Sequence, residues 1–281
     1  MPPGFPHEVR AFACDLDRTL IAEDAVLRPR TLAAIDAARA AGVHVLLVTG
    51  RMFQSVRRYA LVAGITDPVV CYQGAVVADP VSGEFLRHVP MPLAEAREVI
   101  SLVEATGETI LVYVDDELYV SRETPASDAY AGFQHLDVHA VGDLLAWLPK
   151  APTKLVAVGE PSALDRLEEK MKRHFGRRLF ISKSLPHFLE FASPAVTKGS
   201  GLEFAARRLG FASEQTVAFG DGENDLELIE WAGFGVAVAN AHPKVLALAD
   251  YVCPCVEEEG VAQVIESYLA TAASSPPSRA S

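Results

Sequence analysis

The chain has 281 residues, half of them hydrophobic, which is enough to bury the core of one large or two moderate domains. Its formal net charge of −12 excludes partners that need a basic surface, so neither nucleic acid nor an anionic membrane is expected to bind it. An anionic small molecule would have to be attracted by a local positive field within the protein.

The four cysteines show no framework spacing, which is typical of proteins in a reducing compartment. The first seven residues lack the basic start and apolar stretch of a signal peptide. No apolar stretch reaches the roughly 20 residues that span a bilayer. We therefore expect a cytoplasmic protein, and the sequence leaves its oligomeric state open.

Apolar runs and helical patterns alternate through the N-terminal part of the chain. Residues 9–14 and 43–48 are apolar runs typical of buried strands, and residues 31–38 form a helix with an apolar stripe that ends at Gly42. Another helix is expected to start near Met52. The alternation predicts an α/β fold with a doubly wound parallel sheet, as in Rossmann-like proteins.

The pattern changes at Asp79, where a break rich in Pro and Gly precedes shorter strands mixed with helices. Residues 79–191 are predicted to form an inserted α+β cap domain. Two strands are expected over residues 109–120, and the acidic turn between them at Asp115 and Asp116 is interpreted as a solvated loop. Two further strands and an amphipathic helix are predicted over residues 154–158, 188–191 and 162–175.

After the cap, the chain returns to the pattern of the core. Residues 192–272 are predicted to complete the core that residues 1–78 begin. A helix is expected from Lys198 to about Leu209, where Gly210 ends it. Short apolar runs are predicted to continue the sheet at residues 217–219, 236–238 and 250–252. Residues 273–281 are small and polar, and they are predicted to be a disordered tail.

Acidic side chains follow two of the predicted strands, Asp15 and Asp17 after the first and Asp221 and Asp225 after a later one. Because open α/β sheets bind ligands at the carboxyl ends of their strands, these carboxylates could converge on one hard cation such as Mg²⁺. Asp15 and Asp17 also project to the same side of an extended backbone, so one could attack phosphorus while the other handles the proton. Taken alone, an Asp-x-Asp pair is more often a turn or a helix N-cap.

Two further segments carry groups that suit an anion. Thr49 and Gly50 end an apolar run and offer a hydroxyl and free backbone N–H groups, although Thr49 would also serve as a plain helix cap. Lys198 lies in the first turn of a predicted helix, where the macrodipole disfavours a cation. Such a lysine either points into solvent or holds an anion, and taken alone the solvent interpretation is favoured.

Together these segments resemble the motifs of the haloacid dehalogenase (HAD) superfamily of phosphotransferases. Motifs one, two and four of that family resemble residues 15–20, 48–51 and 220–225, and the motif-three lysine falls on Lys198. The motifs follow one another in the right order, and the resemblance covers nearly the whole chain apart from its ends.

The position of the insertion indicates which branch of the superfamily the chain resembles. About 150 residues separate Thr49 from Lys198, so the cap lies between the second and third motifs. That placement, with local matches at residues 71–75, 239–241 and 259–262, resembles the Cof-type branch of sugar-phosphate phosphatases. Members of that branch carry a large α/β cap over the core, and the resemblance implies one here.

Two residues depart from the family pattern. Arg18 stands where most members have glycine, so it must take a backbone conformation that a residue with a Cβ tolerates, or carry some strain. Gln73 stands where the Cof-type branch usually has asparagine, which leaves the functional use of that position open. Neither departure touches the reacting groups directly.

The resemblance implies a Mg²⁺-dependent phosphomonoester hydrolase that acts on a small phosphorylated metabolite, such as a sugar phosphate or a cofactor phosphate. It implies that Asp15 is the nucleophile that forms an aspartyl-phosphate and that Asp17 is the general acid/base. The implied metal ligands are the Asp15 carboxylate, the Asp17 backbone carbonyl, Asp221 and Asp225. The implied phosphate-binding residues are Thr49, Gly50, Lys198 and Asn224.

Two other functions remain open. A phosphomutase of sugar phosphates would use the same aspartyl-phosphate but return the group to another hydroxyl. A non-catalytic phosphosugar-binding sensor would be expected to have lost Asp15 or Asp17, and both are present. Within the cap, the sequence does not choose among three candidate contacts to the leaving group, which are Lys154, Arg122 and His187.

Overall fold

The computed structural model describes residues 1–134 and 136–274. Contacts divide the chain into two compact units, the first made of residues 1–50, 56–86 and the chain from Thr197 onward, the second of residues 51–55 and 87–196. Relative to the predicted domain limits, residues 79–86 group with the first unit and residues 192–196 with the second. Each unit has a sheet of its own.

The first unit is built on a five-stranded sheet with the order β14-β13-β12-β1-β2. Every neighbouring pair of strands is parallel. The strands β1, β12 and β13 are buried throughout, which explains their unbroken apolar sequences. The prediction of a doubly wound parallel sheet is confirmed. The five strands are β1 Ala11–Cys14, β2 His44–Leu47, β12 Thr216–Gly220, β13 Phe234–Val238 and β14 Tyr251–Cys253.

The strand order places a topological switch point at β1. The sequence that follows β1 reaches β2 on one side of it, whereas the other neighbour, β12, comes from the C-terminal part of the chain. In such a sheet a crevice opens beyond the carboxyl ends of the strands at the switch point, and ligands bind there. The residues directly after β1 and β12 are therefore the ones that a ligand would meet.

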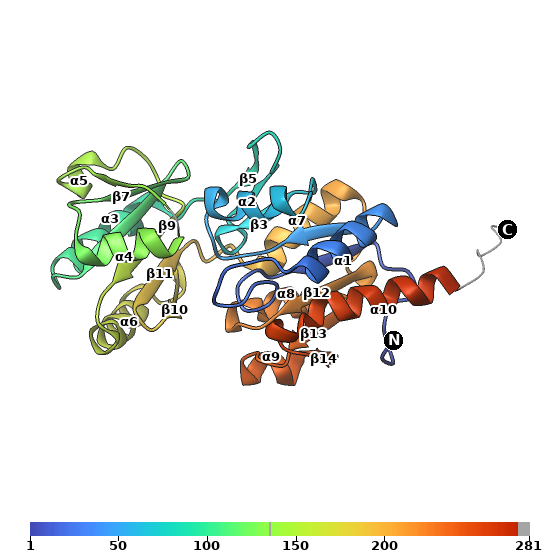
Figure 1. The fold of residues 1–281 in the computed structure, drawn as a ribbon. Helices are drawn as coiled ribbons and strands as arrows, with labels where there is room; N and C mark the ends of the chain where they lie inside the picture. The colour runs from blue at the N-terminus through green and yellow to red at the C-terminus, as the bar shows by residue number, and fades with distance from the viewer. Residues whose placement is uncertain (135, 275–281) are drawn as a thin grey trace. The chain divides into compact units, whose positions relative to one another are not determined.

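Helices flank this sheet. The first and last of them, α1 Pro29–Ala40 and α10 Gly260–Ser274, pack against each other (Figure 1). Arg30 donates two hydrogen bonds to Glu266, at 2.8 and 2.6 Å, but the pair is exposed and contributes little to the stability of the fold. The remaining α-helices that lie wholly or mainly in this unit are α2 Phe53–Val62, α7 Lys198–Leu209, α8 Leu226–Trp231 and α9 Pro243–Leu248.

Helix α10 covers the start of the predicted tail, and residues 275–281 of that tail lie outside the described residues. Within the part of the chain that the structure describes, no helix is both long and apolar enough to cross a membrane.

A three-stranded sheet of β3 Val69–Cys71, β4 Val76–Ala78 and β5 Phe85–His88 follows α2. The turn between β3 and β4 is left-handed at three successive residues, Tyr72, Gln73 and Gly74, with φ values of 52°, 58° and 95°. A Cβ on Gly74 would collide with the carbonyl oxygen of Thr197, just before α7. Only glycine therefore allows this turn to pack against the start of α7.

The second unit is built on a six-stranded sheet with the order β10-β11-β9-β6-β7-β8. Its pairs are antiparallel except β7 with β8, and helices α3 and α6 share an apolar core with β6, β9 and β11. The predicted strands at residues 109–120, 154–158 and 188–191 and the helix at residues 162–175 are confirmed. The strands are β6 Thr109–Val114, β7 Glu117–Val120, β8 Val138–Ala140, β9 Lys154–Val158, β10 Phe180–Leu185 and β11 Phe188–Ala192, and the helices are α3 Leu93–Glu104, α4 Pro125–Gln134, α5 Leu144–Trp147 and α6 Pro161–Phe175.

Candidate active site

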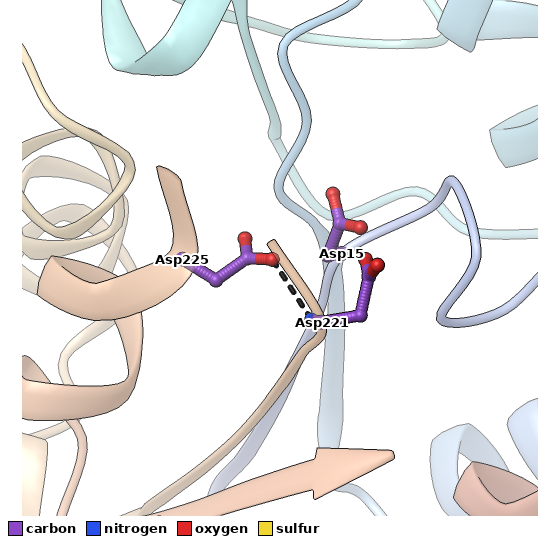
Figure 2. A group of neighbouring side chains, drawn as sticks. All are labelled: Asp15, Asp221 and Asp225. Carbon is purple, nitrogen blue, oxygen red and sulfur yellow. Dashed lines mark hydrogen bonds between the residues drawn. The ribbon is translucent and has the colours of Figure 1, made fainter. Parts of the chain in front are cut away.

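Three buried aspartates meet at the switch point. Asp15 follows β1, where its N–H donates to the carbonyl oxygen of Phe219 in the neighbouring strand β12, and Asp221 follows β12. The carboxylate of Asp225 accepts a hydrogen bond from the N–H group of Asp221 (2.9 Å; Figure 2) and another from that of Gly222 (2.8 Å). One oxygen from each of the three aspartates lies within 4.8 Å of the other two. The structure therefore brings together three of the four predicted metal-binding aspartates.

Lys198 joins this cluster from the first turn of α7. The capping box of Thr197 and Ser200 starts the helix at this lysine. Its ammonium is buried and donates to Asp15 Oδ1 at 2.6 Å and to Asp225 Oδ1 at 2.5 Å. Lys198 therefore does not point into solvent, and its partners in this structure are two carboxylates.

The electrostatics of the cluster follow from burial and from the close carboxylates. Burial and the negative charge of Asp225 raise the pKa of Asp15 well above its ordinary value, against the opposing effect of Lys198. The same two causes raise the pKa of Asp221 to about 6. Burial disfavours the charge of Lys198, but Asp15 and Asp225 outweigh it and raise the pKa of the lysine. Three carboxylates therefore lie close together around one buried ammonium.

The donor set fits a hard divalent cation. Its ligand atoms are carboxylate oxygens, which Mg²⁺ and Ca²⁺ prefer, and neither histidine nor cysteine joins them among the described residues. Asp17, the fourth predicted ligand, is not one of the three clustered carboxylates, and its expected contribution was a backbone carbonyl. Its backbone pairs with Ile21 in an isolated bridge, and its side chain lies close enough to raise the pKa of Asp15.

Three of the four predicted phosphate-binding residues, Thr49, Gly50 and Asn224, lie beside Gln73. Thr49 and Gly50 follow β2, the strand next to β1, and the carbonyl oxygen of Thr49 accepts a hydrogen bond from the N–H of Gln73 (3.1 Å). The Gln73 Oε1 accepts a hydrogen bond from Asn224 Nδ2 (3.1 Å). A Cβ on Gly50 would lie 2.5 Å from Gln73 Nε2, so this glycine leaves room for the amide. Gln73 therefore links Thr49, Gly50 and Asn224.

The sequence left the functional use of Gln73 open and assigned no role to Thr19. The hydroxyl of Thr19 donates to Asp221 Oδ1 at 3.2 Å. A hydroxyl two residues beyond Asp17, close to the carboxyl end of a buried strand, is a signal that could have indicated Thr19. Gln73 offers no comparable local signal, because its left-handed backbone and its bond to a residue 151 positions away depend on the tertiary fold.

The three candidate leaving-group contacts lie in the second unit and differ in burial. Lys154 is buried, and its ammonium lies 3.3 Å from the carboxylate of Glu190, which is also buried. Arg122 and His187 are exposed. Lys154 with Glu190 is therefore the one buried charged pair among these candidates.

The acidic turn between β6 and β7 has a structural role. Asp116 is buried, and its carboxylate accepts hydrogen bonds from the N–H groups of Phe53 (2.9 Å) and Gln54 (2.8 Å) in the first turn of α2. The interpretation of this turn as a solvated loop is therefore wrong for Asp116, which caps a helix. It holds for Asp115, which is exposed and pairs with Lys150.

The protein is an α/β protein with a doubly wound sheet, and carboxylates and a lysine are buried together at the switch point of this sheet. Such a site suits a small anion together with a hard cation. Residues 12–265 match the model of the family described as haloacid dehalogenase-like hydrolase. The chain belongs to this family, so the resemblance inferred from the motifs is confirmed. Relatives across the family are named phosphatases, and the chain is a phosphatase.

The relatives align over both units of the chain. The 5-amino-6-(5-phospho-D-ribitylamino)uracil phosphatase of Bacillus subtilis is 28% identical over 92% of this chain and 96% of its own length. The pyridoxal phosphate phosphatase of Escherichia coli is 28% identical over 92% and 98% of the two chains. A crystal structure from Thermotoga maritima matches with a TM-score of 0.84 and 30% identity, and it covers 92% of this chain and 97% of its own. The inserted unit is therefore part of the shared architecture.

Proposed function

We propose that this phosphatase hydrolyses phosphomonoesters of small metabolites with the help of Mg²⁺, by way of an aspartyl-phosphate on Asp15. The observation that carries the proposal is the buried ammonium of Lys198, which contacts both Asp15 and Asp225. This contact favours the ionised form of the Asp15 carboxylate and fixes its orientation, and a nucleophile needs both.

The reaction has two displacements at phosphorus. In the first, a carboxylate oxygen of Asp15 forms a bond to phosphorus while the bond to the leaving oxygen breaks, and the carboxyl group of Asp17 gives that oxygen a proton. In the second, Asp17 takes a proton from water, whose oxygen attacks phosphorus and releases Asp15 and inorganic phosphate. The effect of Asp17 on the pKa of Asp15 supports this pairing, because it requires the two carboxylates to be near each other.

The donors around the site are proposed to hold the phosphoryl oxygens during both displacements. They are the Thr49 hydroxyl, the Gly50 N–H, the Lys198 ammonium and the Asn224 amide. The hydrogen bond from Asn224 to Gln73 supports a further role for Gln73, which would fix the orientation of the Asn224 amide. Donors that are already oriented stabilise the charge of the transition state at little reorganisation cost.

The proposed metal ligands are Asp15, Asp221, Asp225 and the backbone carbonyl of Asp17. Mg²⁺ bound there would offset the negative charge that Asp15 and the phosphoryl group bring together. The support for this part of the proposal is the all-oxygen donor set, in which three carboxylates lie close together with Lys198 as their buried ammonium.

The substrate is proposed to be a small phosphorylated metabolite in the cytoplasm. Two relatives are named for such compounds, a phosphorylated ribitylaminouracil and pyridoxal phosphate. The net charge of −12 also favours a small anion, since a large polyanion would be repelled by the protein as a whole.

A panel of sugar phosphates and cofactor phosphates tests the proposal, with Mg²⁺ present and both inorganic phosphate and product identity followed. Net phosphate release that EDTA abolishes is the expected result. Conversion to an isomeric phosphate would indicate a mutase, and saturable binding without turnover would indicate a sensor. Asp15→Asn is the matched control, because it keeps the shape of the side chain, and we expect it to lower turnover by at least ~10³-fold. Retention of a tenth of the activity would overturn the role of Asp15.

A further inference from the structure

Arg18 occupies a backbone position that favours glycine. Its φ is 61°, in the left-handed region, which a residue with a Cβ adopts unfavourably. Its N–H donates to the carbonyl oxygen of Ile21 (2.7 Å), and its own carbonyl oxygen accepts a hydrogen bond from Asn240 Nδ2 (2.8 Å). Asn240 is fixed in turn by the N–H of Val256, which donates to its Oδ1 (3.0 Å). The surrounding chain therefore holds Arg18 in this conformation.

The guanidinium of Arg18 reaches back to the acidic cluster. Its Nη1 lies 3.6 Å from Asp221 Oδ2, and its Nη2 donates to the carbonyl oxygen of Asn240 at 3.4 Å. The other carboxylate oxygen of Asp221 accepts the hydroxyl of Thr19. The side chain of Arg18 is 61% exposed whereas that of Asp221 is 7% exposed, so the cation approaches the buried carboxylate from the solvent side.

We propose that Arg18 is a counter-charge that competes with the divalent cation for Asp221. In the metal-free protein the guanidinium offsets part of the carboxylate charge, and a metal ion bound at Asp221 must either displace it or remain beside a like charge. Arg18 therefore weakens divalent cation binding and makes it easily reversible. This inference rests on the proposed role of Asp221 as a metal ligand. It concerns the charge of one side chain and not the chemistry at phosphorus.

Calorimetric titration of the full chain with Mg²⁺, without substrate, measures the effect directly. Three variants separate charge from backbone strain: Arg18→Lys keeps the charge, Arg18→Gln removes it but keeps a Cβ, and Arg18→Gly removes both. We expect Arg18→Gln and Arg18→Gly to bind Mg²⁺ about three- to tenfold more tightly than the wild type at low ionic strength, with Arg18→Lys within about twofold of it. The difference should shrink in 0.5 M salt, because the guanidinium is exposed to screening.

If Arg18→Gln and Arg18→Gly bound Mg²⁺ as tightly as the wild type or more weakly, the inference would be overturned. It would also be overturned if Arg18→Lys bound Mg²⁺ as much more tightly than the wild type as the two uncharged variants do. Asp221→Asn distinguishes this failure from failure of the proposed metal site. If Asp221→Asn loses Mg²⁺ binding while Arg18→Gln matches the wild type, the metal site stands and the role of Arg18 does not. If the wild type binds no Mg²⁺, both are overturned.

Discussion

Replacing Gly74 by alanine tests whether the turn between β3 and β4 fixes the start of α7 and so the position of Lys198. The new Cβ would meet the carbonyl group of Thr197, with the carbonyl carbon at 2.9 Å, and would lie 3.3 Å from the backbone nitrogen of Gly201. These are backbone atoms, which cannot move aside as a flexible side chain can. Alanine would also have to adopt φ near 95°.

Gly42→Ala is the matched control, because Gly42 has a φ of 79° but nothing within 4 Å of a Cβ added to it. We expect the control to lose about 1–2 kcal/mol of unfolding free energy from the left-handed backbone alone. Gly74→Ala should lose a further ~1–3 kcal/mol from the close contact. It should also lower turnover, because displacement of α7 moves Lys198 away from Asp15.

Urea unfolding followed by circular dichroism, together with phosphate release from an aryl phosphate, measures both effects in the two variants. Equal stability losses, or normal turnover in a folded Gly74→Ala protein, would refute the reasoning that this turn places Lys198.

Three other outcomes are expected. Asp17→Asn should reduce turnover of an alkyl phosphate by roughly 10² to 10⁴-fold but that of p-nitrophenyl phosphate much less, because a good leaving group needs little proton donation; equal losses in steady-state assays would argue against the acid role. Lys154→Met should lower the unfolding free energy by about 3–5 kcal/mol, because it leaves the buried Glu190 carboxylate without its ammonium, and Lys154→Met with Glu190→Leu should recover most of this in urea titrations. If the double variant recovered none of the lost unfolding free energy, the unpaired Glu190 carboxylate would not be the cause of the loss. Burial and Asp225 raise the pKa of Asp221 from 3.8 to about 6. Between these two pH values the folded metal-free protein therefore binds more protons than the unfolded chain, so its stability should fall as the pH rises through this range. Measured in EDTA, the wild type should lose on the order of 2 kcal/mol more than Asp221→Asn between about pH 4 and pH 7, and an equal pH dependence in both would contradict the raised pKa.

The centre of the sheet could be predicted because β1, β12 and β13 are buried throughout and have unbroken apolar sequences. Once a parallel sheet is expected, residues that follow its strands must meet at one edge, so the convergence of Asp15 with Asp221 was also predictable. The limits of α7 were correct at both ends, because Thr197 is a good cap and Gly210 a good terminator, with φ 77°.

The contacts that complete the site were not predictable from local pattern. Gln73 meets Asn224 and Arg18 meets Asn240 across 151 and 222 positions of sequence, and neither periodicity nor turn chemistry encodes such a pair. The interpretation of the turn at Asp116 as a solvated loop was wrong for the same reason, because the N–H groups that Asp116 caps come from a distant segment. The limits of the two units likewise depend on tertiary contacts, which group residues 79–86 with the first unit although the composition changes before them.

The stereochemical course at phosphorus tests the central claim, that the phosphoryl group passes through Asp15, most directly. A substrate whose phosphorothioate group is chiral, with sulfur and two oxygen isotopes on phosphorus, would be hydrolysed in water labelled with the third oxygen isotope, and the configuration of the released thiophosphate determined. Each in-line displacement inverts the configuration, so transfer to Asp15 followed by transfer to water predicts net retention. Net inversion would mean that water attacks the substrate phosphorus directly, and it would contradict the aspartyl-phosphate on Asp15.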